Sequence, residues 1–291
     1  MPVKIASALE VPPLLPGRIV HLPGRGEIFV RHHIHRNPEA PTLLLLHGWT
    51  ASSDLQFFTA YEELAQHYSV IGVDHRGHGR GLRPNRPFAL EDCADDAADV
   101  VRALGIGSVT LVGYSMGGPI SLLLWKRHPE LVDAMVLQAT ALEWNGTRSE
   151  RNRWRVGHAL GPVIRRVSTP RMIRFGLRKA IPRGHELSRF IPWIVGEVRR
   201  NDQWMVSEAG RAISHFDARG FAAEVDVPAA FVLTTHDRLV LPHKQKAVAD
   251  AIRAEVIELH GDHLAPMQMP REFSAATRRA VELVQSRLNA G

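Results

Sequence analysis

The chain has 291 residues, 45% of them hydrophobic, and its longest aliphatic runs fall far short of the about 20 residues that a membrane-spanning helix needs. A transmembrane segment is therefore not expected. The first residues form an apolar stretch broken by Pro12, Pro13 and Pro16, so a signal peptide is not expected either. The formal net charge is +6. Cys93 is the only cysteine, which excludes an intramolecular disulfide and a thiolate metal cluster and favours a cytoplasmic location.

The first half of the chain predicts alternating strands and helices. A hairpin is expected from two extended runs on either side of the glycine-containing turn at residues 23–26. Apolar runs then predict buried strands, each followed by a segment with helical spacing. The expected strands are residues 19–22, 27–34, 42–46, 69–73, 108–112 and 134–138, and the expected helices are residues 55–65, 91–104 and 119–128. This alternation predicts a mostly parallel sheet covered by helices.

The alternation breaks between about residues 143 and 224, where no strand-like run occurs. An apolar stripe from Leu187 to Val198 predicts one helix there, kinked at Pro192. The pattern then resumes with strands at residues 229–234 and 256–259 and helices at residues 244–252 and 270–288. We therefore predict the α/β class: a core of residues 1–142 and 225–291 with a mostly parallel eight-stranded sheet, and an all-helical cap of residues 143–224 inserted after the sixth strand.

Basic residues are concentrated in the helical region. Residues 146–225 contain 16 Arg or Lys and 7 Asp or Glu, and Arg171, Arg174 and Arg178 recur on one face of an expected helix. Charge runs of this kind usually form solvent-exposed faces. They also attract anionic small molecules, phospholipid surfaces or nucleic acid, so the sequence leaves the role of this basic surface open.

The most informative motif is G-x-S-x-G, formed by Gly113, Ser115 and Gly117. It directly follows an expected buried strand and directly precedes an expected helix. A sharp strand-to-helix turn strains its central residue, and glycines two positions away on either side remove side chains that would collide there. The free N–H groups at the start of the helix point toward the place where negative charge would develop during acyl transfer. Ser115 is therefore the candidate nucleophile.

A serine hydroxyl needs a general base, and His263 is the best placed of the 16 histidines. It follows the last expected strand, so its loop lies at the same edge of the sheet as Ser115. Asp237 ends the preceding strand and is the candidate carboxylate that orients the imidazole. Asp262 is too close in sequence to reach around the ring of His263 easily, and His260 is expected to be packed or hydrogen-bonded at the strand end.

The chain order Ser115, Asp237, His263, together with Leu45–Trp49 (LLHGW) after the first buried strand, resembles the α/β-hydrolase family. The resemblance covers nearly the whole chain. It implies a sheet of eight mostly parallel strands, a serine hydrolase site of the esterase type, and a helical lid over that site.

The resemblance also implies an oxyanion hole, made by the backbone N–H groups of Trp49 and Met116. The segment Asp74–Arg80 (DHRGHGR) is similar to the family's loop after the next strand. The family usually ends that loop with a small hydroxyl residue, whereas this chain has Gly81. We expect this departure to leave the triad intact and to make the loop less predictable.

Side chains in and beside the helical region are expected to shape a substrate pocket, because the resemblance implies that this region covers the active site. Four of the six tryptophans lie there. Aromatic side chains with a few polar groups are typical of small-molecule sites, although they also suit ordinary packing of a small helical domain. The candidate pocket residues are Trp49, Tyr114, Trp144, Trp193, Leu239 and Leu264.

These residues predict a serine hydrolase that cleaves a carboxylic ester or a related acyl compound through an acyl-enzyme, with no cofactor and no metal. The expected partner is a small-molecule acyl substrate, with anionic and lipid-like compounds included, and nucleic acid is not expected. Carbon–carbon bond hydrolases and cofactor-free haloperoxidases share the Ser, His and Asp set, so both remain alternatives. The sequence leaves the oligomeric state open.

Two other function classes have weaker support. A basic surface binder would use the arginines and the aromatic residues between them, but no helix-turn-helix, zinc or RNA-binding signature accompanies the charge. Metal-dependent hydrolysis is suggested only by short histidine groups without carboxylates at ligand spacing. These groups are His75 with His78, His260 with His263, and the cluster His32, His33 and His35.

Overall fold

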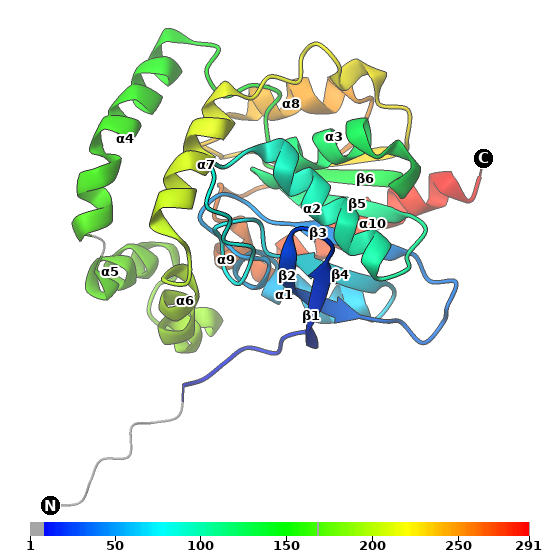
Figure 1. The fold of residues 1–291 in the computed structure, drawn as a ribbon, viewed down its shortest axis with the longest axis horizontal. Helices are drawn as coiled ribbons and strands as arrows, with labels where there is room; N and C mark the ends of the chain where they lie inside the picture. Colours follow the sequence, from blue (N-terminus) through cyan, green and yellow to red (C-terminus); the bar gives the residue numbers. More distant parts are fainter. Residues whose placement is uncertain (1–8, 168, 291) are drawn as a thin grey trace, which may run out of the picture.

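A computed structural model describes residues 9–167 and 169–290 of the chain, and in this part eight strands form one sheet (Figure 1). The strand order is β1-β2-β4-β3-β5-β6-β7-β8, with β2 antiparallel to β1 and β4 and every other neighbouring pair parallel. The predicted sheet is therefore confirmed. The strands are β1 (Gly17–Leu22), β2 (Gly26–His33), β3 (Thr42–Leu46), β4 (Ser69–Val73), β5 (Val109–Tyr114), β6 (Val132–Gln138), β7 (Ala229–Thr234) and β8 (Glu255–Leu259).

Helices cover both faces of the sheet (Figure 1). The helices of one face are α1 (Ser53–Ala65), α9 (Ala265–Gln268) and α10 (Pro270–Leu288), and those of the other face are α2 (Leu90–Ala103), α3 (Gly117–Arg127) and α8 (Pro242–Ala251). The sequence places the five longer helices of this core to within two residues at each end. Within the described ranges, no helix is long and apolar enough to cross a bilayer.

The side chains of the central strand β3 are buried on both faces of the sheet. Leu43 and Leu45 pack in the hydrophobic cluster of one face, while Leu44 and Leu46 pack in the cluster of the other. All four side chains are fully buried, because helices cover a parallel sheet on both sides and every position of the strand must then be apolar. Since β3, β5, β7 and β8 run in parallel, the loops after them lie at one edge of the sheet.

Between β6 and β7, the described residues of the segment 143–224 form helices, loops and one isolated bridge between Glu143 and Asp217. This segment, called the insert, lies to one side of the sheet (Figure 1). Its α-helices are α4 (Arg148–Val167), α5 (Pro170–Ala180), α6 (Ile191–Val198) and α7 (Gln203–His215). The single kinked helix predicted from Leu187 to Val198 is wrong, because residues 186–190 form a separate 3₁₀ helix. Pro192 lies in the first turn of α6, where its missing N–H removes no helical hydrogen bond, so it starts a helix instead of bending one.

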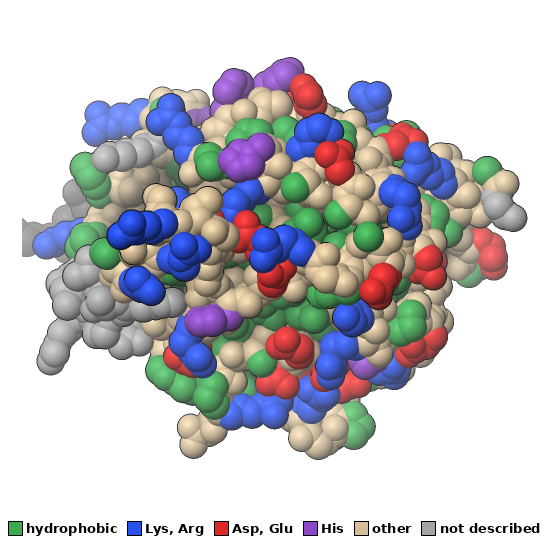
Figure 2. Space-filling view, turned by 90° about the horizontal axis from the view of Figure 1, so that it is seen from above, with side chains coloured by type: hydrophobic (Ala, Val, Ile, Leu, Met, Phe, Trp, Pro, Cys, Tyr) green, Lys and Arg blue, Asp and Glu red, His purple; other side chains and the backbone are tan. Residues whose placement is uncertain are grey.

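Exposed basic side chains are concentrated on the insert. Seen from above, Lys and Arg side chains gather on the left of the molecule, on the side of the insert, with few acidic side chains between them (Figure 2). The rest of that face mixes both signs. The prediction of a solvent-exposed basic face is confirmed for the arginines of α4 and α5 whose side chains are described. These are Arg148, Arg151, Arg153, Arg155, Arg171, Arg174 and Arg178.

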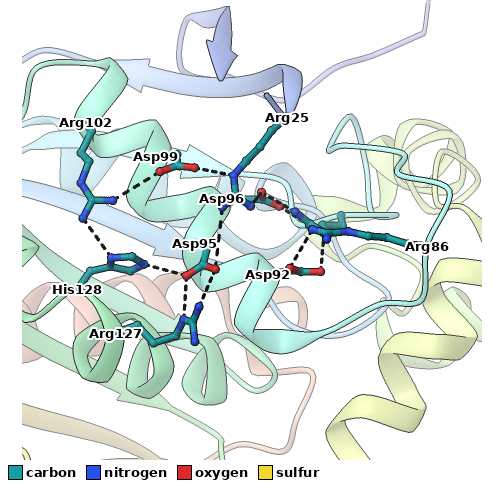
Figure 3. Close-up of polar contacts among 10 residues, drawn as sticks. Arg25, Arg86, Asp92, Asp95, Asp96, Asp99, Arg102, Arg127 and His128 are labelled. Atoms are coloured by element: carbon teal, nitrogen blue, oxygen red, sulfur yellow. Dashed lines mark hydrogen bonds and ion pairs between the residues drawn. The ribbon is translucent and has the colours of Figure 1, made fainter. Parts of the chain in front are cut away.

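An ion-pair network fixes the β1–β2 turn and the loop after β4 onto α2 (Figure 3). Arg76, in the loop after β4, is buried and pairs with Asp96 at 2.5 Å and with Asp92 at 2.7 Å. Arg25, in the β1–β2 turn, pairs with Asp96 at 2.9 Å and with Asp99 at 2.6 Å. A buried guanidinium is tolerated only with such partners, so the network holds the loop of residues 74–80 in one conformation.

Candidate active site

Ser115 lies in the sharp turn between β5 and α3, with a φ of 52° in the left-handed region. A Cβ atom at Gly113 would lie 2.5 Å from the Gly117 carbonyl oxygen, and one at Gly117 would lie 2.0 Å from the Leu46 carbonyl oxygen. The turn therefore needs glycine at both positions, as the motif predicts. The backbone strain at Ser115 is of the kind that persists only where the surrounding structure enforces it.

The structure brings Ser115, His263 and Asp237 into one hydrogen-bonded chain. Nε2 of His263 lies 3.0 Å from Oγ of Ser115, and Nδ1 of His263 lies 2.7 Å from Oδ2 of Asp237. An ionised carboxylate only accepts, so Nδ1 carries the proton and Nε2 is left to accept the serine proton. Burial alone would raise the pKa of Asp237, but the hydrogen bond and the charge of His263 hold it below its usual value.

Residues that sequence reasoning missed fix the carboxylate of Asp237. Its Oδ1 accepts the backbone N–H groups of Leu239 and Val240, at 2.8 and 2.9 Å. Its Oδ2 accepts the Thr234 hydroxyl at 2.9 Å, and the Gln245 amide lies 3.3 Å away. Gln245 comes from α8 and is fully buried, and no local sequence pattern marks such a glutamine. Both carboxylate oxygens of Asp237 therefore accept hydrogen bonds from groups other than His263.

The two residues expected to form the oxyanion hole lie on segments that adjoin Ser115. Within residues 9–167 and 169–290, neither the Trp49 nor the Met116 backbone N–H has a hydrogen-bond acceptor. Met116 follows Ser115 directly, and a Cβ atom at Gly48 would lie 3.3 Å from the Cβ of Ser115, so the loop of Trp49 runs alongside the serine. Unsatisfied N–H groups beside a hydroxyl are what a developing oxyanion requires.

The six candidate pocket residues differ in exposure. Trp49, Leu239 and Leu264 are 36%, 54% and 46% exposed, on the three loops that also carry Gly48, Asp237 and His263. Tyr114 and Trp193 are buried, and the Trp193 ring packs edge-on against Phe58 at 5.3 Å. Trp144 is partly buried against the core. The three exposed apolar side chains, on loops at the same edge of the sheet as Ser115, are called the rim below.

The histidines of the short pairs have different surroundings from one pair to the next. His263 points to Ser115, whereas His260 lies on the surface with Nδ1 3.2 Å from the Thr235 hydroxyl. Burial lowers the pKa of His75 to about 3 and that of His78 to about 4, so both rings are neutral.

The departure at Gly81 has a steric explanation. A Cβ atom there would lie 2.3 Å from the His75 carbonyl oxygen and 2.4 Å from the Asp74 carbonyl oxygen. Backbone atoms cannot move aside as a flexible side chain can, so the loop as it folds in this chain has no room for a serine at this position.

A family model described as the alpha/beta hydrolase fold matches residues 41–170. Among curated relatives, the 2-(acetamidomethylene)succinate hydrolase of Mesorhizobium japonicum is 33% identical over 36% of this chain and 37% of that protein. The pyrrolizixenacetamide deacetylase of Xenorhabdus hominickii is 25% identical over 81% of this chain and 88% of that protein. With the first of these relatives, the match therefore spans well under half of the relative's length.

Among solved structures, the esterase of Exiguobacterium antarcticum superposes with a TM-score of 0.78 at 19% identity, over 92% of this chain and all of that chain. At this identity the likeness concerns the fold. The eight-stranded sheet and the helices on its two faces are shared over nearly the full length.

Proposed function

Because this chain belongs to the α/β-hydrolase family, we propose that it is a serine hydrolase in which Ser115 is the nucleophile, His263 the general base and Asp237 the residue that orients His263. One observation carries the proposal: the Ser115 hydroxyl lies 3.0 Å from a histidine nitrogen whose other nitrogen is held by a buried carboxylate. A serine in a strained turn, with an aligned base and two free amides beside it, has little purpose other than acyl transfer.

In the first half-reaction, Oγ of Ser115 attacks the substrate carbonyl carbon while its proton passes to Nε2 of His263. The carbonyl oxygen becomes an oxyanion, which accepts hydrogen bonds from the Trp49 and Met116 backbone N–H groups. Losing one such donor typically raises the barrier by about 3 kcal/mol. His263 then donates the proton to the leaving alcohol, and the C–O bond to that alcohol breaks.

In the second half-reaction, water attacks the carbonyl carbon of the acyl-Ser115 ester while His263 accepts one of its protons. The tetrahedral intermediate collapses to the carboxylic acid, and the proton on His263 returns to Oγ of Ser115. Asp237 stabilises the imidazolium that forms in both halves without itself becoming protonated, because its pKa is held low. The cycle balances without a cofactor.

The proposed substrate is a small carboxylic ester that presents an apolar group to the rim of Trp49, Leu239 and Leu264. Residues 143–224 serve in this proposal as a cap, whose arginines favour anionic or lipid-like substrates. Amide cleavage is a second candidate, because two relatives are named a 2-(acetamidomethylene)succinate hydrolase and a pyrrolizixenacetamide deacetylase. A cytoplasmic location is part of the proposal and rests on the single cysteine.

A fluorophosphonate probe tests the class. We expect covalent labelling of the wild-type protein, no labelling of Ser115→Ala, and full labelling of Ser286→Ala, which changes an exposed serine on α10. Labelling that survives Ser115→Ala would exclude Ser115 as the nucleophile. Absence of labelling in all three proteins would contradict the serine hydrolase proposal itself.

A substrate panel tests the reaction. Nitrophenyl esters of increasing acyl length, with neutral and anionic acyl groups, should be hydrolysed with a preference for apolar or anionic members. The matching anilides would report amide cleavage, and a ring-cleavage diketone would report carbon–carbon bond hydrolysis. Turnover of the diketone or the anilides above that of every ester would replace the ester proposal with that reaction.

A further inference from the structure

A buried histidine, His47, holds the loop that carries the Trp49 N–H by a hydrogen bond to the Gly48 carbonyl. The backbone N–H of His75 donates to Nε2 of His47 at 2.9 Å, so the proton of the His47 ring lies on Nδ1. Nδ1 then donates to the Gly48 carbonyl at 2.8 Å. Burial holds the pKa of His47 well below its usual value, so the ring stays neutral and this tautomer persists. The peptide plane between Gly48 and Trp49 is therefore fixed from its carbonyl side.

The other end of the loop is strained and depends on the helical insert. Thr50 has a φ of 64°, a left-handed conformation that a β-branched residue adopts only under constraint. Its carbonyl accepts a hydrogen bond from Nδ2 of Asn201 at 2.7 Å. Oδ1 of the same side chain accepts the Gly79 N–H at 2.8 Å, and since an N–H only donates, the orientation of the Asn201 amide is determined.

Asn201 lies between α6 and α7 and is itself held in place. It is 7% exposed, and its neighbour Asp202 donates its backbone N–H to the Gly77 carbonyl at 2.7 Å. Arg83 bridges the same two segments, with one terminal nitrogen 2.7 Å from the Gly79 carbonyl and 3.0 Å from the Arg200 carbonyl. The Asn201 amide is thus a fixed link between the insert, the loop after β4 and the loop after β3.

The side chain of Trp49 is held by the insert as well. Its indole Nε1–H donates to the Val206 carbonyl of α7 at 2.8 Å. A Cβ atom at Gly210 would lie 2.7 Å from the indole ring, so the ring lies directly against the backbone of α7. The Trp49 side chain and the Thr50 carbonyl are therefore both held by contacts with the insert, while His47 holds the Gly48 carbonyl from the core side.

We propose that Asn201 is a positioning residue for the oxyanion hole, holding Thr50 so that the backbone N–H of Trp49 faces the Ser115 hydroxyl. This inference rests on the proposed function. The insert then does more than cover the site, because it positions a donor of the oxyanion hole. Without the hydrogen bond from Asn201, the strained Thr50 backbone relaxes and displaces the Trp49 N–H. Misplacing a donor by a fraction of an ångström weakens the bond to the transition state more than it weakens substrate binding.

Asn201→Asp is the most selective test. The carboxylate keeps an acceptor for the Gly79 N–H but replaces the donor to the Thr50 carbonyl with another acceptor. For a nitrophenyl ester, we expect kcat to fall by about tenfold or more while KM changes by less than about twofold. The inhibition constant of an aryl boronic acid, which forms a tetrahedral adduct with a serine nucleophile, should rise by the same factor as kcat/KM falls. Asn201→Ala should also lower kcat with little change in KM.

Asn145 provides the matched control. It also lies in the insert and donates from Nδ2 to a backbone carbonyl, that of Ser214, at 2.8 Å, but in the described part of the chain none of its hydrogen bonds reaches the loop after β3. Asn145→Ala should keep kcat and boronate affinity within about twofold of wild type. All variants are compared well below the melting temperature of the least stable one, so differences in folding do not enter.

Wild-type kcat in Asn201→Asp, or a raised KM with unchanged kcat, would overturn the inference and leave the insert with a role in substrate binding alone. Equal losses in the Asn201 and Asn145 variants would also overturn it, because the effect would then be general to the insert. These outcomes require a wild-type enzyme with Ser115-dependent labelling. Absence of such labelling would instead overturn the proposed function.

Discussion

The hydroxyl of Tyr114 donates a hydrogen bond to the backbone carbonyl of His263 at 3.0 Å, which ties the residue before Ser115 to the loop of the proposed base. The two rings also lie 5.5 Å apart. Burial, together with the nearby Asp237 and Asp262, raises the pKa of Tyr114 well above its usual value, so the hydroxyl stays protonated and remains a donor. The spacing between nucleophile and base therefore depends on a contact from β5 itself.

Tyr114→Phe should lower both stability and turnover. The substitution removes the donor to the His263 carbonyl, and we expect the free energy of unfolding to fall by about 1–2 kcal/mol. The kcat for an ester should fall several-fold with little change in KM, because the imidazole is less confined. Urea unfolding and steady-state kinetics measure the two effects. Tyr68→Phe, which alters a tyrosine just before β4 at the opposite edge of the sheet, is the control and should leave kcat unchanged.

Asp237→Asn should abolish most of the activity without unfolding the protein. The backbone N–H groups of Leu239 and Val240 require an oxygen at the Oδ1 position, so the new amide NH₂ must face His263. A donor there forces the imidazole into the wrong tautomer, and kcat should fall by on the order of 10⁴. Steady-state kinetics and the rate of fluorophosphonate labelling should fall together, and a loss of less than tenfold in both would show that Asp237 does not orient the base.

Asp74 should make stability depend on pH between about 4 and 6. Its buried carboxylate accepts the N–H groups of Ser53 and Arg80, at 2.7 and 2.8 Å, but burial outweighs them and raises the pKa to about 6 from 3.8. The folded state thus binds this proton more tightly than the unfolded state. The stabilisation is complete below about pH 4 and is lost as the pH rises through about 6.

Asp74→Asn removes this titration. The free energy of unfolding of wild type relative to the variant should fall by about 2 kcal/mol from pH 4 to pH 7, since each pKa unit corresponds to about 1.4 kcal/mol and the unfolded state is already partly ionised at pH 4. Urea unfolding of both proteins at intervals across that range measures the difference. Parallel stability curves would show that Asp74 has no raised pKa in the folded protein.

Gly81→Ser, which introduces a hydroxyl residue of the kind the family usually has, should destabilise this chain. The new Cβ would collide with the carbonyl oxygens of His75 and Asp74, and we expect the free energy of unfolding to fall by about 1–3 kcal/mol. Gly176→Ser is the matched control, because a Cβ at that exposed position in α5 meets nothing within 4 Å. Thermal unfolding distinguishes the two, and equal melting temperatures would mean that the loop adapts.

The sequence was sufficient for the features that have a local physical signal. A fully buried parallel strand such as β3 must be apolar at every position. A strained strand-to-helix turn needs the glycines Gly113 and Gly117, so both features can be predicted from one sequence. The parallel order of the strands then brings Asp237 and His263 to the edge where Ser115 lies. The boundaries of α10 follow in the same way from Pro270 at its start and its helical spacing.

Only the tertiary structure showed which hydrogen bonds hold the loops at that edge of the sheet. Asn201 and Thr50 are 151 positions apart and Tyr114 and His263 are 149 apart, and no periodicity or motif relates residues at such separations. Gln245 is a different case: its three partners lie only 11, 8 and 5 positions before it, yet no local pattern marks this glutamine as buried. Local sequence determines the strands and turns because their constraints act over a few residues, whereas partners for buried polar groups exist only once distant segments have packed together.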